Sequence, residues 1–317
     1  MSERVTVGVP TYNRAAGLER TVASVLAQSF GDLEVVISDN ASTDGTAELC
    51  ARLAAADPRV RVLRHDVNAG LTANFNAVLA AGTGELVIVV ADDDWLDPDY
   101  LERCVGFLDA HPGHVLASGS ARYHRGEELR GPGVDVDCEQ DDPAARVRWY
   151  FAHVVDNASI YGVMRRTALA GALPMPNALA GDWILVGRVL MAGKLHTVRE
   201  TVVHRSVGGT SASFQDTARS LGLTGAQARH PHVAMARLIR DDIATGAPAY
   251  ASLPARERRR LGTACALAVL RARPLDVVND ALAPLLRHPR MARVDAAAHR
   301  AVRRLRGQDE GDTPYLP

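Results

Sequence analysis

The sequence predicts an α/β fold in which a Rossmann-like, mostly parallel sheet is flanked by helices. Short apolar runs rich in Val and Ile alternate with segments whose apolar residues recur every three or four positions, the patterns of strands and helices. Such alternation is typical of parallel strands joined by right-handed crossovers. Polar clusters directly follow the early strands. Because ligands of open α/β sheets bind beyond the carboxyl ends of the strands, these clusters predict a binding site.

Strand–helix pairs fill the first part of the chain, residues 1–112. Pro10 is expected to end the first strand, because proline has no backbone N–H to pair. Thr43 or Asp44 is a candidate cap for the second helix, and Pro98 stands at the start of the fourth. The expected strands are Arg4–Val9, Leu33–Ser38, Val60–Arg64 and Glu85–Ala91, and the expected helices are Ala15–Gln28, Thr46–Ala56, Leu71–Ala81 and Pro98–His111.

The rest of the chain is less regular and then becomes helical. The expected elements are strands at 115–120, 159–164 and within 195–204, a loop-rich segment at 126–140, and helices at 143–154, 182–191, 227–245, 254–273, 275–287 and 291–306. We therefore expect a domain at 1–214 with halves at 1–112 and 113–214, a helical region at 215–307 and a disordered polar tail at 308–317.

Composition narrows the class of protein. The chain has 317 residues, 47% of them hydrophobic, and a net charge of −1, which gives no general attraction to nucleic acid. No signal region or membrane-spanning run is recognised, so a cytoplasmic protein is expected. The widely spaced cysteines are expected to be reduced thiols, and they are Cys50, Cys104, Cys138 and Cys265.

A basic stretch lies near the end of the chain and contains few acidic residues. Its plainer interpretation is a solvated helix face. The alternative is contact with an anionic membrane surface, which would place the protein peripherally at the inner membrane face. The stretch comprises Arg287, Arg290, Arg293, Arg300, Arg303, Arg304 and Arg306.

Three adjacent aspartates, Asp92, Asp93 and Asp94, follow the most apolar strand. Their charges repel one another, and a fold tolerates this when a cation occupies the gap. Carboxylates suit Mg²⁺ or Mn²⁺, which proteins often share with substrate phosphates. The plainer interpretation is a solvated acidic turn before Pro98. The glycine-rich dinucleotide and P-loop motifs are absent, which leaves a metal-dependent way of holding phosphate.

Several segments resemble motifs of glycosyltransferase family 2. They are VPTYNR at 9–14, SDNASTDGT at 38–46, NAGLTANFN at 68–76, ADDDWLDPDYL at 91–101, GVMRR at 162–166, AGDWILVGRVLMAG at 180–193 and HRSVGGTS at 204–211. The resemblance implies the GT-A fold, with a donor half at 1–112 and an acceptor half at 113–214. It also implies an enzyme that moves a sugar from a nucleoside diphosphate to an acceptor hydroxyl with inversion.

The resemblance also implies roles for the aspartates. Asp93 corresponds to the carboxylate that meets the metal, Asp94 to the metal's water shell or the sugar, and Asp92 to the ribose or the metal. Relatives commonly keep their first carboxylate where this chain has Ala91. We therefore assign Asp93 and Asp94 to Mg²⁺ or Mn²⁺ and Asp92 to the nucleotide sugar.

Asp39 matches the family residue that accepts a hydrogen bond from the base. Uracil, thymine and guanine have a ring N–H to donate, and neutral cytosine has none, so a UDP-, dTDP- or GDP-sugar is implied. Local turns are the plainer roles of Asp39 and Asn68. The other residues implied at the nucleotide sugar are Pro10, Thr11 and Tyr12 around the base, and Arg14, Asn68 and Asn74 at the phosphate or ribose.

Asp182 matches the family's catalytic base, and Trp183 is the aromatic residue that follows it. A carboxylate is the usual group that takes the proton of an attacking hydroxyl. The plainer role is a helix cap. His204 and Arg205, with the glycines of 208–211, resemble the family's closing loop, although Val207 stands where relatives carry a second His.

Two other functions remain open from the sequence. One is a sugar-nucleotide-binding or scaffold protein without catalysis, which the presence of the aspartates and Asp182 does not favour. The other is a nucleotidyltransferase, which would need a basic, glycine-rich loop where this chain has Pro10, Thr11 and Tyr12.

Overall fold

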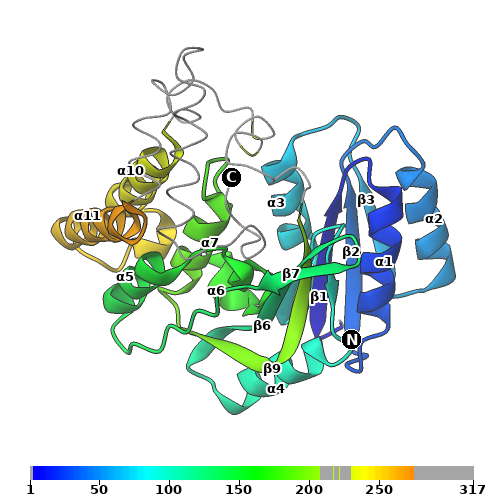
Figure 1. The fold of residues 1–317 in the computed structure, drawn as a ribbon, viewed down its shortest axis with the longest axis horizontal. Coiled ribbons are helices and arrows are strands. Elements are labelled where there is room, and N and C mark those ends of the chain that lie inside the picture. The colour runs from blue at the N-terminus through cyan, green and yellow to red at the C-terminus, as the bar shows by residue number, and fades with distance from the viewer. Residues whose placement is uncertain (1–2, 208–216, 218–220, 222–229, 275–317) are drawn as a thin grey trace.

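A mixed sheet forms the centre of the molecule, whose computed structural model describes residues 3–207, 217, 221 and 230–274 (Figure 1). Among these residues the sheet has nine strands in the order β3-β2-β1-β4-β8-β6-β9-β5, and β7 pairs with β6. The strands are β1 (Val5–Thr11), β2 (Leu33–Asp39), β3 (Val60–Arg64), β4 (Leu86–Val89), β5 (Trp95–Leu96), β6 (His114–Arg125), β7 (Glu128–Pro132), β8 (Val163–Arg165) and β9 (Lys194–Ser206). The predicted α/β class is confirmed.

The N-terminal half contains the parallel strands β1 to β4. Every residue of β1 and β2 is buried, as expected of strands covered on both faces. In Figure 1, α3 lies on the opposite side of these strands from α1 and α2. The helices of this half are α1 (Ala15–Leu26), α2 (Thr46–Ala56), α3 (Leu71–Ala81) and α4 (Tyr100–Ala110).

The first strand runs through Pro10 to Thr11, so the expectation that Pro10 ends it is wrong. Pro10 is paired in register with Ser38 of β2. The pairing of β1 with β4 ends at Gly8 and Val89. The β1–β4 pairing stops before Pro10, which has no N–H to continue it, whereas β1 stays paired with β2 as far as Thr11.

The C-terminal half contains two departures from the expected elements. Residues 126–140, expected as loop, include β7, which forms a hairpin with β6 across a turn at Gly126 with φ of 62°. The expected strand at 159–164 begins instead as a 3-10 helix, η1 (Ala158–Tyr161), and only then enters β8. Asp156 accepts a hydrogen bond from the backbone of Ala158, a local bond that favours a turn over a strand.

The helices of this half lie to one side of the sheet (Figure 1). Outermost is α11, which packs against α5 and α10. No helix of the described chain has the length and apolar character needed to cross a bilayer. The expected helices at 275–287 and 291–306 and the tail at 308–317 lie outside the described residues. The helices here are α5 (Pro143–His153), α6 (Arg166–Ala170), α7 (Gly181–Val189), α10 (Pro231–Thr245), η2 (Pro248–Tyr250) and α11 (Ala255–Ala272).

A buried ion pair fastens α10 to α7. The side chain of Arg188 is 9% exposed and donates to both carboxylate oxygens of Asp242, with 3.2 Å between Nε and Oδ2. Arg188 also donates to the carbonyls of Ala172 and Pro174, so it ties the segment before α7 to the same point. Its charge is satisfied without water.

We expect Asp242→Ala to lower the free energy of unfolding by about 3–5 kcal/mol, because it leaves a buried guanidinium without its carboxylate. The adjacent Asp241 provides a matched control, since it pairs with Arg240 at the surface. Asp241→Ala is expected to cost less than about 1 kcal/mol. Urea unfolding measures both, and equal losses would contradict the role given to the pair.

Candidate functional site

The carboxyl ends of β1, β2 and β4 bring the first polar clusters together. Thr11 and Asp39 are neighbours across the β1–β2 pairing. The hydroxyl of Thr11 donates to Oδ2 of Asp92 over 2.7 Å, which joins the end of β1 to the turn after β4. The polar clusters predicted at these strand ends therefore meet at one edge of the sheet, as parallel strands require.

Helix α1 packs against the acidic turn, which is formed by Asp92, Asp93 and Asp94. The hydroxyl of Thr21 donates to the carbonyl of Asp94 over 2.7 Å. A Cβ at Gly17 would lie 2.5 Å from the carbonyl oxygen of Asp92, so only glycine allows the helix to come this close. On the other side, Ser206 donates its hydroxyl to the carbonyl of Asp93 over 2.6 Å. Sequence reasoning missed these supports, because small residues on an amphipathic helix carry no functional signal by themselves.

The three aspartates have different environments. Burial raises the pKa of Asp92 to about 6, against the opposing hydrogen bond from Thr11. Burial also raises the pKa of Asp94 to about 7, although Arg205 lies nearby and the backbone N–H of Ser206 donates to Asp94 over 2.7 Å. Asp93 is more open and accepts a hydrogen bond from Nη1 of Arg14 over 2.9 Å.

The loop after β1 is locked to the loop after β2. Asn13 has a φ of 53°, and its side chain accepts from the N–H of Thr43 over 2.8 Å. The N–H of Asn13 donates to the hydroxyl of Ser42 over 2.9 Å. Tyr12 stands between these anchored residues with 42% of its surface exposed. Its ring is thus available to lie against a flat ligand.

Asp39 is fully buried and already has partners. Its Oδ1 accepts from the N–H of Ser42 over 2.9 Å, the local turn that was the plainer prediction. Its Oδ2 accepts from Nη1 of Arg64 over 2.7 Å. The Arg64 side chain is 51% exposed, so it can leave Asp39 without disturbing the core. A base that bonds to Asp39 would meet this guanidinium first.

The two asparagines predicted at the phosphate or ribose bind mainly to the protein. Asn68 accepts from Nδ2 of Asn40 over 2.8 Å and from the N–H of Gly70 over 2.9 Å, which makes it a loop bend. Asn74 donates to the carbonyls of Thr11 and Ser38, so it joins the ends of β1 and β2. Its buried Oδ1 has no hydrogen-bond partner among the described residues and can only accept, which suits a hydroxyl better than a phosphate.

Asp182 lies in the first turn of α7, which begins at Gly181, so Asp182 is not the residue that caps this helix. Its Oδ2 accepts from Nδ2 of Asn157 over 2.8 Å. Burial raises its pKa, while the hydrogen bond from Asn157, the N–H of Trp183 and the charge of Arg205 lower it. A carboxylate with a raised pKa is a better proton acceptor than an ordinary aspartate.

Arg205 acts on both the acidic turn and Asp182. Its Nε is 3.9 Å from Oδ2 of Asp94, and its charge lowers the pKa of both Asp94 and Asp182. It also donates to the hydroxyl of Tyr123 over 2.8 Å, and its guanidinium carbon lies 4.7 Å from the ring centre of Tyr161. The sequence motif placed Arg205 in the closing loop but did not predict its interactions with Asp94 and Asp182.

His204, its neighbour, has a packing role. Its Nε2 lies 2.9 Å from Oδ1 of Asp97, and its Nδ1 lies 3.0 Å from Nε2 of His124. Its ring stacks on Trp95 with 5.0 Å between ring centres. Both ring nitrogens are therefore engaged within the protein. The remainder of the closing-loop motif, at 208–211, lies outside the described residues.

Two other features bear on ligands. In the part of the chain that the structure describes, no three His, Cys, Asp or Glu side chains are grouped as ligands for a metal ion.

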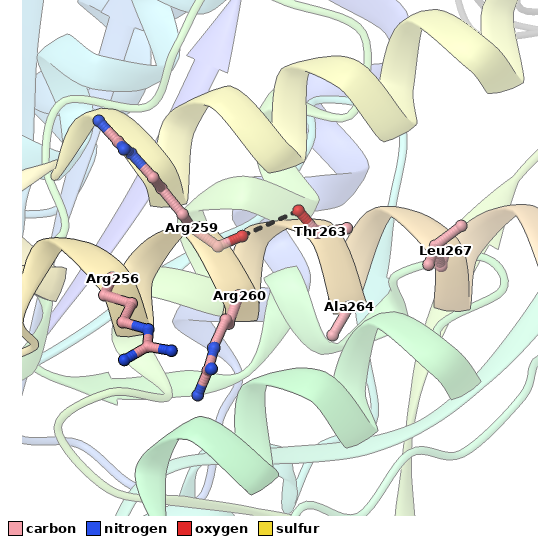
Figure 2. Close-up of a pocket in the computed structure, with 6 residues that line it drawn as sticks. All are labelled: Arg256, Arg259, Arg260, Thr263, Ala264 and Leu267. Carbon is pink, nitrogen blue, oxygen red and sulfur yellow. Dashed lines mark hydrogen bonds between the residues drawn. The ribbon is translucent and has the colours of Figure 1, made fainter.

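A hollow lies on the outer surface of α11, away from the strand ends (Figure 2). Its lining is basic and aliphatic and consists of Arg256, Arg259, Arg260, Thr263, Ala264 and Leu267.

Comparison with known proteins identifies the family. Residues 6–170, more than half of the chain, match the family model described as glycosyl transferase family 2. The chain belongs to this family. The family predicted from its motifs is thereby confirmed, and the motifs at 180–193 and 204–211 lie beyond the matched residues.

Its relatives include proteins of several bacteria. An uncharacterized glycosyltransferase of Nostoc sp. is 37% identical over 217 residues, which are 66% of each chain. The glycosyltransferase GlyA of Streptococcus pneumoniae is 33% identical over 161 residues, 51% of this chain but only 21% of that protein. A β-1,3-glucosyltransferase of Campylobacter jejuni that acts on a polyprenyl-linked glycan, by its name, is 30% identical over 141 residues, 43% of this chain and 45% of that one.

Solved structures share the GT-A fold. A mannosyltransferase from Pyrobaculum calidifontis, solved with GDP-mannose and Mn²⁺, has a TM-score of 0.54 and 21% identity, and the match covers 98% of this chain and 89% of that one. Residues 1–349 of S. aureus TarS give a TM-score of 0.51 at 19% identity, covering 97% and 93%. The predicted GT-A fold is confirmed for this family 2 chain.

The raised pKa of Asp92 makes stability depend on pH. The native state keeps this proton up to a pH of about 6, whereas the unfolded chain loses it near 3.9. Within that window the native state binds more protons than the unfolded state, so the free energy of unfolding falls as pH rises. Above a pH of about 6 the Asp92 carboxyl is ionised in both states, and the free energy of unfolding stays lowered by the full cost of burying that charge.

Asp92→Asn removes this penalty. We expect it to raise the free energy of unfolding by about 1–3 kcal/mol at pH 7.5 without divalent cations, and by less than half of that at pH 4.5. Urea unfolding at both pH values measures the difference. Asp66→Asn, in an exposed loop, is the control and should change little. An equal gain at both pH values would show that burial of the Asp92 charge is not its source.

Proposed function

We propose that this chain transfers a sugar from a UDP-, dTDP- or GDP-sugar to an acceptor hydroxyl, with inversion at the anomeric carbon. The observation that carries the proposal is the position of Arg205, which contacts the acidic turn at Asp94 and also acts on Asp182. One positive charge thus acts on both a strand-end site of nucleotide-binding character and a carboxylate suited to proton transfer. A transferase needs its donor and its base in one site.

The donor side is supported by the arrangement of the strand ends. Tyr12 offers an exposed ring for the base, while Pro10 and Thr11 form the adjoining strand end. Asp39 is the proposed acceptor for the base N–H, once Arg64 has moved aside. Arg14, Asn68 and Asn74 stay predictions for the phosphate or ribose, and the protein contacts of Asn68 favour a supporting role.

The acidic turn fits a divalent cation. Asp92 and Asp94 are buried carboxylates with raised pKa values, a strain that added positive charge relieves. Asp93 already accepts from a cationic group, the Arg14 guanidinium. We propose that Asp93 and Asp94 hold Mg²⁺ or Mn²⁺ together with the diphosphate, because Mg²⁺ commonly takes only one or two carboxylates. When bound, the ion supplies positive charge to the departing diphosphate.

Asp182 is the proposed general base. As the acceptor oxygen bonds to the anomeric carbon, its proton passes to Asp182, and the bond from that carbon to the diphosphate oxygen breaks. The nucleoside diphosphate leaves with the electron pair of that bond. One carboxylate acting as base agrees with inversion, since a retaining reaction of the double-displacement kind needs a second carboxylate as nucleophile.

Several wider predictions remain. The division into domains at 214 and 307, a cytoplasmic location and peripheral contact with the inner membrane face all stay predictions. The Arg-rich stretch at 287–306 lies outside the described residues. The matches cover only part of several relatives, 21% of the pneumococcal GlyA among them, so the acceptor of this chain does not follow from theirs.

A nucleotide screen tests the donor class. We expect UDP, dTDP or GDP to raise the melting temperature in the presence of Mn²⁺, and less so with EDTA, whereas CDP should have little effect because cytosine lacks the ring N–H. Asp39→Ala should remove the preference over CDP. No shift with any nucleotide would sink the proposed function.

Asp182→Asn tests the base. We expect nucleotide binding to persist and sugar transfer to fall by about 10²–10⁴-fold, the range typical of lost general base catalysis. The amide can still accept a hydrogen bond but cannot take a proton. Steady-state transfer and the nucleotide-induced melting shift are measured on the same preparation. Undiminished turnover would exclude Asp182 as the base, and nucleotide binding without transfer by the parent chain would favour the scaffold alternative.

A further inference from the structure

Behind Asp182 lies a short chain of buried hydrogen bonds that ends in the core. Tyr150 of α5 is fully buried and donates its hydroxyl to Oδ1 of Asn157 over 2.6 Å. The hydroxyl of Ser159 donates to the same oxygen over 3.1 Å. Asn157 then donates its Nδ2 to Oδ2 of Asp182 over 2.8 Å. Donation thus runs from the two hydroxyls through the Asn157 amide to the Asp182 carboxylate.

That direction fixes the orientation of the Asn157 amide. Two hydroxyl donors meet its oxygen, and a carboxylate meets its nitrogen. Turning the amide over would set its oxygen against the Asp182 carboxylate, which can only accept while ionised, whereas the hydroxyls of Tyr150 and Ser159 can donate or accept. Asn157 is 2% exposed, so water cannot replace the lost bonds. The amide therefore presents a donor to Asp182.

The backbone at Asn157 is also unusual. Its φ of 49° and ψ of 41° lie in the left-handed region, which asparagine tolerates better than most residues. The segment around it is anchored on both sides. Asp156 accepts from the N–H groups of Val134 and Ala158, and the carbonyl of Tyr161 accepts from the buried hydroxyl of Tyr100. The strained position is thus over-determined by its surroundings, as is common beside active sites.

We propose that Asn157, held by Tyr150, is a positioning residue that orients Asp182 and keeps it ionised for proton transfer. The inference rests on the proposed function, in which Asp182 is the base. The hydrogen bond to Oδ2 limits rotation of the carboxylate, as do the backbone N–H groups that donate to it. It also favours the charged form, which opposes the effect of burial.

Of the groups that influence Asp182, Arg205 also interacts with Asp94, whose pKa is raised to about 7 and which therefore titrates as well. Arg205 from β9 stays positively charged throughout. Burial raises the pKa of the Tyr150 hydroxyl well above its ordinary value, so it remains a neutral donor. Trp183, the next residue of α7, acts through its backbone N–H. Because Asp94 contributes to the same acid limb, a change after substitution at Asn157 is assigned to Asp182 by following the titration of Asp182 itself.

Asn157→Gly is the decisive variant, because glycine keeps the left-handed backbone and removes the whole amide, which donates to Asp182 and accepts from Tyr150 and Ser159. We expect the acid limb of kcat/KM for transfer to move up by about one to two pH units, as loss of a hydrogen bond to a charged group implies. On the acid limb the activity should fall about tenfold or more, and it should recover toward the parent value on the alkaline side of that limb. Nucleotide affinity should not change.

Tyr150→Phe and Asn157→Asp complete the series. The first leaves the amide but removes its anchor, so a smaller shift in the same direction is expected. The second keeps the shape and places a carboxylate beside Asp182, so a larger shift is expected. A loss of activity that is equal at every pH in all variants would assign Asn157 a merely structural role and overturn the proposal.

A second readout separates this inference from the proposed function. The carboxyl carbon of Asp182 can be followed by ¹³C NMR over the same pH range, with its signal assigned by comparison with Asp182→Asn. An upward shift of its titration in Asn157→Gly supports the inference even if the parent chain transfers no sugar from the donors tested. An unchanged titration overturns the inference even if Asp182 proves to be the base.

Discussion

The structure depends on burying negative charge at the end of β4. Asp92 and Asp94 lie largely within the protein, and burial raises the pKa of both carboxyls. The cost is reduced, not removed, by hydrogen bonds from Thr11 and Ser206 and by the nearby charge of Arg205. Stable folds seldom keep such groups without a use. Elements from distant parts of the sequence, α1 and β9 among them, bond to this short turn.

Two features of distant sequence make that arrangement possible. Gly17 lets α1 approach the acidic turn, where any larger residue would meet the Asp92 carbonyl. The end of β9 covers the turn from the other side, where Ser206 bonds to Asp93 and Asp94. Because Arg205 precedes Ser206, the same strand also carries the positive charge that lowers the pKa of Asp182. The strand end therefore couples the donor side of the site to the acceptor side.

The strands β1 to β4 and the convergence of their polar ends were predictable from the sequence. The period of the apolar residues located β1 to β4, and parallel topology then required their polar ends to converge. What pattern cannot give is the partner of each polar group. Asp39 meets Arg64, and Asn74 braces two strand ends, through contacts that span 25 and 63 residues of sequence. Such pairings depend on loop geometry and leave no periodic trace.

The clearest failure of local pattern is also the most informative. The residues from 159 to 164 have the composition of a strand, but the chain enters a 3-10 helix after a left-handed Asn157. Local propensity is overruled because side chains at 156, 157 and 159 bond within the segment and to Tyr150. Natural sequences depart from local preference mainly where function demands it. Here the departure delivers an amide donor to Asp182 from a buried, fixed direction, which a regular strand at this position would not do.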